Sequence, residues 1–276
     1  MEAEIKKVNL ILSRLPGFLT EDSLRLFCIL AKHSQNRDDK LLEIGVFCGR
    51  SLAGLGWAFR GCEAIGVDPL FESFVDSPAF RDEAEYLMQV AGGLTPEARL
   101  RLFWSRIREI EVATSRPLNK NISIVRNTQD QYFAEHRGND ERFQLVHIDG
   151  EHNYSAVKNA LDELPYLLLD RAWLVVDDFL NEGFPDISEA VYRHSSFRTR
   201  LWPVFFGFNK AVFYYGASGD SMLETLQDRI AADISLSGYA IRRLSDRSVM
   251  GYGIPQAVDP SRHSRVWQLF RGLLGK

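Results

Sequence analysis

Apolar residues recur at helical intervals in the first part of the chain. Ile5, Val8 and Leu12 lie three to four residues apart, which predicts a helix that a Pro-Gly pair then ends. Thr20 precedes a second run with the same spacing and is a suitable N-cap for a second helix. We therefore expect N-terminal helices within residues 1–40.

From residue 41 onward the pattern changes to short apolar runs, which predict strands. These runs alternate with amphipathic segments, as is typical of a parallel sheet covered by helices on both faces. The predicted strands lie within residues 41–47, 63–68, 121–127, 143–149, 172–179 and 203–215. The last range holds two strands around a tight Gly/Asn turn, an antiparallel hairpin that we place at the sheet edge. We predict an α/β fold with a Rossmann-like, seven-stranded, mostly parallel sheet.

Two segments extend this core. Residues 70–118 are too long for a simple crossover, and Thr95 begins a helix within them, so we expect a helical insertion that forms a lid or an oligomer contact. Residues 216–276 are expected to be a C-terminal helical extension. Its last segment, residues 264–276, is expected to dock on the body or on another subunit, with binding to a membrane surface as the alternative. Its apolar face is made by Val266, Trp267, Phe270, Leu273 and Leu274. Without repeats or low-complexity linkers, residues 1–276 read as one domain around a core at 41–215.

Composition and charge narrow the class of protein. The 276 residues are 45% hydrophobic and 25% charged, as expected for a globular protein with a core. A net charge of -4 does not favour nucleic acid or an anionic membrane as a partner. Apolar runs stay shorter than the roughly 18 residues that span a bilayer. Three cysteines without a CxxC pair, and an acidic N-terminus without a signal-peptide pattern, lead us to expect the cytoplasm.

A glycine-containing loop follows the first predicted strand. Gly45 and Gly49 would let the backbone turn sharply and approach a ligand, with Ser51 opening the next helix. The spacing differs from the GxGxxG dinucleotide pattern, and Glu43 would repel a pyrophosphate. An acid at this place suits a cationic group such as the amino end of methionine. A plain strand–helix turn is the alternative.

The second predicted strand ends in an acid, Asp68. A carboxylate at this place can accept hydrogen bonds from both ribose hydroxyls of a nucleoside. A helix cap or a solvated strand end is the alternative. Together with the glycine loop, Asp68 favours a nucleoside ligand.

Three more acids end neighbouring strands. Asp149 follows the fourth strand, and Asp177 and Asp178 follow the fifth. Adjacent strand ends lie about 5 Å apart, so these carboxylates should converge and repel one another unless one is protonated or a cation lies between them. Oxygen ligands in this number suit Mg²⁺, Mn²⁺ or Ca²⁺. Helix capping by Asp149 or Asp178 is the alternative.

A histidine accompanies these acids. His152 follows Asp149 by three residues and can accept a hydroxyl proton near neutral pH. A surface histidine is the alternative for His152, whereas His147, inside the strand, is expected to be a core histidine.

These motifs together resemble those of the class I S-adenosylmethionine-dependent methyltransferases, whose first motif is an acid, a glycine, three residues and a glycine. The chain is more specifically similar to macrolide sugar O-methyltransferases and cephalosporin-hydroxylase-like proteins. That similarity rests on the HIDGEHNY segment from His147 to Tyr154 and on VVDDF around Asp177. Thr128 and Gln129 resemble the Ser-Gln pair that meets the adenine in catechol-type methyltransferases.

The resemblance implies an O-methyltransferase that acts on a hydroxyl of a sugar or small natural product, with S-adenosylmethionine and Mg²⁺ or Mn²⁺. The expected cofactor-binding residues are Glu43, Gly45, Gly49, Ser51, Asp68, Thr128, Gln129 and Asp149. Catalysis is assigned to His152 and Asp149, and metal binding to Asp149, Asp177 and Asp178. A small-molecule acceptor and a homo-oligomer are the expected partners.

Two alternatives belong to other classes. A nicotinamide-dependent oxidoreductase shares this type of fold, but Glu43, the missing third glycine and the terminal hairpin disfavour it. A nucleoside-binding subunit without catalysis would have no need for the acids and His152.

Overall fold

The computed structural model of the chain describes residues 1–34, 39–70, 89–118, 120–137, 139–217 and 221–253. The helices are α1 (Glu2–Leu12), α2 (Glu21–His33), α3 (Arg50–Ala58), α5 (Pro96–Thr114), α6 (Gln129–His136), α7 (Tyr154–Leu167), α8 (Pro185–Arg193) and α9 (Ser221–Leu236). The strands are β1 (Lys40–Ile44), β2 (Ala64–Val67), β3 (Ile122–Val125), β4 (Phe143–Ile148), β5 (Leu168–Val176), β6 (Leu201–Gly207), β7 (Lys210–Tyr215), β8 (Tyr239–Arg243) and β9 (Val249–Gly253).

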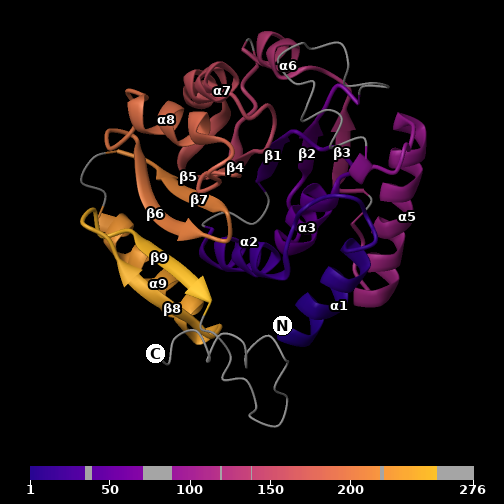
Figure 1. The fold of residues 1–276 in the computed structure, drawn as a ribbon, viewed down its shortest axis with the longest axis horizontal. Coiled ribbons are helices and arrows are strands. Elements are labelled where there is room, and N and C mark those ends of the chain that lie inside the picture. Colours follow the sequence, from indigo (N-terminus) through magenta and orange to yellow (C-terminus); the bar gives the residue numbers. More distant parts are fainter. Residues whose placement is uncertain (35–38, 71–88, 119, 138, 218–220, 254–276) are drawn as a thin grey trace, which may run out of the picture.

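A single mixed sheet forms the centre of the molecule, with strand order β3-β2-β1-β4-β5-β7-β6-β9-β8 (Figure 1). The first five strands in this order are parallel, as predicted. The chain winds outward from β1 in one direction and resumes at β4 in the other. In such sheets ligands bind at the carboxyl ends of the two strands where the order reverses. The switch point between β1 and β4 is therefore the expected binding edge.

Within the residues that the structure describes, the sheet has nine strands, so the prediction of seven is wrong. The two additional strands, β8 and β9, come from the segment that we expected to be helical throughout. β9 pairs with β6 through Phe205 and Val249, which places the β6–β7 hairpin inside the sheet and not at its edge. The hairpin itself is antiparallel as predicted. Covering the outer side of β6 satisfies backbone groups that an edge strand leaves unpaired.

Helices cover both faces of the sheet, as predicted (Figure 1). α1, α2, α3, α5 and α9 contribute to the core on one face, and α6, α7 and α8 to the core on the other. Ile5, Val8 and Leu12 of the first predicted helix are buried. Thr20 caps α2 by accepting a hydrogen bond from the Ser23 amide. The local signals at the N-terminus were therefore sufficient to locate these helices.

The insertion contains the predicted helix, α5, which begins after Thr95. Phe103, Ile107 and Ile110 of α5 are buried, and the helix packs against α1 and α3. Residues 71–88 of the insertion lie outside the described residues, as does the apolar face at 266–274. Among the residues that the structure describes, no helix is long and apolar enough to cross a membrane.

Candidate active site

The β1–α3 loop can adopt its path only with glycine at two positions. Gly45 and Gly49 have φ values of 89° and 80°, a region that other residues rarely adopt. A side-chain carbon at Gly45 would overlap the carbonyl oxygen of Asp149, and one at Gly49 would overlap the Phe103 ring. The glycines therefore let the loop lie directly against the end of β4, between the sheet and α5.

Asp68, at the end of β2, holds this loop. Its Oδ2 accepts hydrogen bonds from the backbone amides of Val46 (2.8 Å) and Phe47 (2.7 Å), and its Oδ1 accepts one from Leu70 (2.6 Å). A carboxylate has about four acceptor positions. Three are used within the protein, so Asp68 orders the loop and keeps capacity for one further donor.

Glu43 of β1 and Ser51 of α3 flank this loop and contact each other. The Ser51 hydroxyl donates to Glu43 Oε1 over 2.8 Å, while Glu43 Oε2 lies 3.0 Å from His147 Nδ1. The side chains of Glu43 and His147 are fully buried. Glu43 is thus turned into the core, and Ser51 is its link to the loop surface.

Thr128 and Gln129 lie where β3 leads into α6. Thr128 is the N-cap of α6 and forms a capping box with Gln131. Gln129 donates a hydrogen bond to the Ala156 carbonyl of α7 over 2.9 Å. Both side chains have structural roles in this geometry, and Gln129 joins α6 to the helix that follows the Asp149 loop.

The acids and His152 converge at the carboxyl ends of β4 and β5. His152 Nε2 lies 3.4 Å from Asp178 Oδ2 and 3.9 Å from Asp149 Oδ1. The three side chains are partly exposed, at 16%, 19% and 25% for His152, Asp178 and Asp149. Phe184 packs on the imidazole, with ring centroids 4.4 Å apart. We call Asp149, His152 and Asp178 the acid rim.

Asp178 is held in an unusual backbone conformation, with φ of 51°. Its Oδ1 accepts hydrogen bonds from Asn181 (2.8 Å) and from Asn209. Asn209 lies in the β6–β7 turn, where it and Phe208 both have positive φ, the pattern of a type I′ hairpin turn. Side chains from two loops therefore fix the orientation of the Asp178 carboxylate. Left-handed conformations of this kind are enriched at functional sites.

Asp177 belongs to a different set of contacts. Its Oδ2 accepts a hydrogen bond from the Lys210 ammonium and lies 3.6 Å from His147 Nε2. Lys210 is almost completely buried. The predicted trio of Asp149, Asp177 and Asp178 is therefore divided, because a lysine already provides the counter-charge for Asp177.

The cluster shifts the pKa values of its members in different directions. Burial, together with the charge of Asp177, raises the pKa of Asp149 to about 6, although His152 opposes the shift. Burial also favours the neutral form of Asp177, but Lys210 and His147 outweigh it and bring its pKa well below the ordinary range. Burial and Lys210 lower the pKa of His147, whereas contacts with Asp177 and Glu43 raise it overall to about 9. Perturbed groups of this kind are typical of functional sites.

The donor set of the acid rim fits a divalent cation. One oxygen each from Asp149 and Asp178 and a nitrogen of His152 lie within 4.8 Å of one another. The two carboxylates suit Mg²⁺ or Mn²⁺, whereas an imidazole is more often a ligand of Zn²⁺, Fe²⁺, Ni²⁺ or Cu²⁺. Asp177 forms a second such group with His147 and Asp149, but it would have to leave Lys210 to bind a cation.

Lys210 and Asn209 were not recognised from the sequence. Asn209 lies in the hairpin turn, and Lys210 is the first residue of β7, which is otherwise apolar. A lysine at the first position of such a strand is the signal that could have drawn attention to it. His147 is a buried histidine, as expected, but its contacts with Glu43 and Asp177 also make it part of the site.

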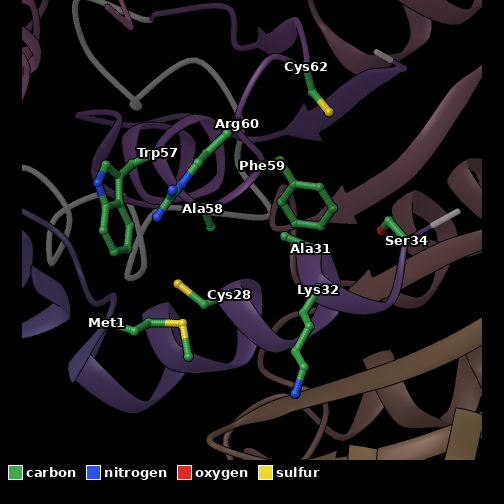
Figure 2. Close-up of a pocket in the computed structure, with 10 residues that line it drawn as sticks. All are labelled: Met1, Cys28, Ala31, Lys32, Ser34, Trp57, Ala58, Phe59, Arg60 and Cys62. Atoms are coloured by element: carbon green, nitrogen blue, oxygen red, sulfur yellow. The ribbon is translucent and has the colours of Figure 1, made fainter. Parts of the chain in front are cut away.

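A cavity of about 260 Å³ lies elsewhere, between α2 and the end of α3. Cys28, Trp57, Phe59 and Cys62 are among the side chains that line it (Figure 2). Cys62 precedes β2, so this cavity is at the amino ends of the strands, away from the acid rim. We place the chemistry at the rim, where the titratable groups converge.

Comparisons with known proteins identify the family of the chain. A family model described as a methyltransferase domain matches residues 42–179, half of the chain. A comparison with curated proteins found no match to this chain. Among solved structures, the calicheamicin methyltransferase CalS11 is similar at a TM-score of 0.50 and 16% identity, over 78% of this chain and 92% of that one.

Two further structures are similar at lower scores. The O-methyltransferase TomG from Streptomyces achromogenes has a TM-score of 0.45 and 14% identity, over 78% of this chain and 90% of that one. An O-methyltransferase from Bacillus cereus has a TM-score of 0.45 and 12% identity, with the same coverage. The family match spans the glycine loop and the acid rim, and it does not favour the oxidoreductase alternative. The chain belongs to the methyltransferase-domain family, as a class I enzyme that uses S-adenosylmethionine.

Proposed function

We propose that the protein transfers a methyl group from S-adenosylmethionine to a hydroxyl oxygen of a sugar or another small natural product. The observation that carries this proposal is the position of His152 beside Asp149 and Asp178, at the strand ends that also hold the glycine loop. Methyl transfer to oxygen needs a base close to the cofactor. The name of CalS11, a calicheamicin methyltransferase, suggests the same class of acceptor.

His152 is the general base in this proposal. A neutral imidazole accepts the hydroxyl proton, and Asp178, 3.4 Å from Nε2, stabilises the imidazolium that forms. Phe184 and the neighbouring acids limit the rotation of the ring. The protein mainly aligns the acceptor oxygen with the methyl carbon and removes one proton.

The cofactor lies over the glycine loop in this proposal. Gly45 and Gly49 allow close approach, and Ser51, backed by Glu43, faces the methionine end. The remaining acceptor capacity of Asp68 is available to a ribose hydroxyl. Thr128 and Gln129 border the adenine end, and Asp149 lies between the cofactor and the acceptor.

A divalent cation is part of the proposal. Asp149 and Asp178 would hold it, with Asp177 retained by Lys210 and His152 left to act as the base. When bound, such a cation lowers the pKa of the acceptor hydroxyl and stabilises the developing negative charge. The two aspartates would hold it, and Asn181 and Asn209 keep the Asp178 carboxylate oriented.

The proposal is tested by methyl transfer to a panel of sugar nucleotides, glycosides and phenols, followed by mass spectrometry. We expect a product 14 Da heavier than one acceptor, loss of turnover in EDTA, and recovery with Mg²⁺ or Mn²⁺. Asp178→Asn should be inactive, with affinity for S-adenosylhomocysteine nearly unchanged. Full activity in EDTA together with an active Asp178→Asn variant would reject the cation. Cofactor binding without turnover on any acceptor would instead favour the non-catalytic alternative.

A further inference from the structure

Four polar side chains lie next to one another across the middle of the sheet. Glu43 of β1 is the register partner of His147 of β4. Asp177 directly follows β5, and the antiparallel register of β5 with β7 places it opposite Lys210. The strands β1, β4, β5 and β7 are consecutive in the sheet. The row therefore runs from β1, which leads into the glycine loop, to the β6–β7 hairpin. We call Glu43, His147, Asp177 and Lys210 the buried row.

Each member of the row contacts the next. Lys210 donates to Asp177 Oδ2, which lies 3.6 Å from His147 Nε2, and His147 Nδ1 lies 3.0 Å from Glu43 Oε2. The row also contacts both parts of the site. Glu43 Oε1 accepts a hydrogen bond from Ser51 of α3, beside the glycine loop, and Asp177 Oδ1 accepts one from the Asp178 amide at the acid rim, each over 2.8 Å.

The row is closed off from solvent by α2. The Phe27 ring lies 5.6 Å from the His147 ring and 5.8 Å from the Lys210 ammonium. Exposure of the four side chains ranges from 0% for Glu43 and His147 to 15% for Asp177. Water cannot replace a lost partner at such sites, so removal of one charge forces its neighbours to rearrange.

We propose that Lys210 is a positioning residue for cofactor binding. Lys210 fixes the Asp177 carboxylate. Asp177 and His147 in turn fix Glu43, which orients the Ser51 hydroxyl beside the glycine loop. A lysine on the hairpin thereby sets cofactor affinity without contact with the cofactor. The proposal rests on the cofactor placement proposed above, and it is independent of the acceptor and of the cation.

The test is calorimetric titration of the full chain with S-adenosylhomocysteine. Lys210→Met should weaken binding by about tenfold, within the range of couplings between connected residues. Lys210→Arg keeps the charge and should bind within about threefold of the native chain. Lys158→Met is the matched control, because Lys158 is half-exposed and pairs with Asp162 on the surface of α7. It should leave the affinity unchanged.

A double-mutant cycle with Ser51 separates positioning from general loosening of the fold. If Lys210 acts through Ser51, Lys210→Met should weaken binding by less than about threefold in a Ser51→Ala background. Equal weakening in both backgrounds, or an affinity within twofold of native for Lys210→Met, overturns the proposal. If Lys210→Met fails to fold, the double variant Lys210→Met/Asp177→Asn, which removes both charges, replaces it in the same cycle. The same two outcomes then overturn the proposal.

Discussion

The glycine loop and the acid rim lie against each other at one edge of the sheet, yet they balance their charges in opposite ways. In the loop, the Asp68 carboxylate accepts three backbone hydrogen bonds, and Glu43 has a partner for each oxygen. At the rim, Asp149 and Asp178 face each other across a single imidazole. The carboxylates of the loop region are mostly paired within the protein, whereas the rim holds more negative charge than its neighbours offset.

This difference suggests how the two parts work. A loop whose polar groups are already paired is rigid before the cofactor arrives, which reduces the ordering that binding requires. Converging carboxylates have the opposite property, since their repulsion is relieved only by a proton or a cation. Functional sites often lower the stability of the folded protein in this way.

The largest effect should come from the rim. His152→Ala should reduce kcat by about 10²- to 10⁴-fold, the usual contribution of a general base. Affinity for S-adenosylhomocysteine should stay within twofold, because the loop does not depend on His152. His194→Ala is the control, since His194 pairs with Asp162 at a distance from the site. If the two variants were equally active, His152 would not be the general base.

The next effect should come from the loop backbone. Gly45→Ala should lower the free energy of unfolding by about 3 kcal/mol and abolish cofactor binding, because its new carbon overlaps Asp149. Gly238 also has positive φ, at 90°, but has open space around it. Gly238→Ala should therefore cost only about 1 kcal/mol. Thermal unfolding and calorimetry compare the two, and similar losses would mean that close approach at Gly45 is unimportant.

A smaller effect is expected at Asp68. Asp68→Ala leaves three backbone amides without their acceptor and should weaken S-adenosylhomocysteine binding by about 1–3 kcal/mol. Asp68→Asn keeps one acceptor oxygen and should lose less. Calorimetry measures both. Native affinity in Asp68→Ala would show that the loop keeps its shape by other contacts.

The smallest effect is a pH dependence of stability. The pKa of Asp149 is raised to about 6 in the folded protein, so its ionised form destabilises the fold above that pH. This penalty should fade as the pH drops from 6 toward the unfolded pKa near 4. In EDTA, Asp149→Asn should therefore stabilise the protein at pH 7 and much less at pH 5, as measured by urea unfolding.

A control of opposite sign is available on the surface. Contacts with Lys158 lower the pKa of Asp162, so its contribution to stability is present above its unfolded pKa and is lost as the pH falls through its folded pKa. Asp162→Asn should be slightly destabilising at pH 7. A stabilising effect of Asp149→Asn that is equal at pH 5 and pH 7 would contradict the charge imbalance at the rim.

Local signals determined much of this protein from its sequence. Thr20 and Thr95 cap their helices as predicted, because a side-chain oxygen bonds an amide only three residues away. The buried strands could be predicted because short apolar runs between amphipathic segments are typical of parallel strands that are covered on both faces. The glycines and the strand-ending acids were found because neighbouring parallel strands bring their carboxyl ends to one edge.

Other features depend on residues that are far apart in the chain, and only the tertiary structure decided them. Lys210 reaches Asp177 because β7 is antiparallel to β5 in one particular register, and a shift by one residue would turn the lysine to the other face. The same register brings Asn209 to Asp178. The strands β8 and β9 form where the outer side of β6 offers unpaired backbone groups, and their own short sequences give little indication of it. Pairing partners across a sheet are set by global packing, which is why the counter-charge of the site was not visible in the motif that carries its acids.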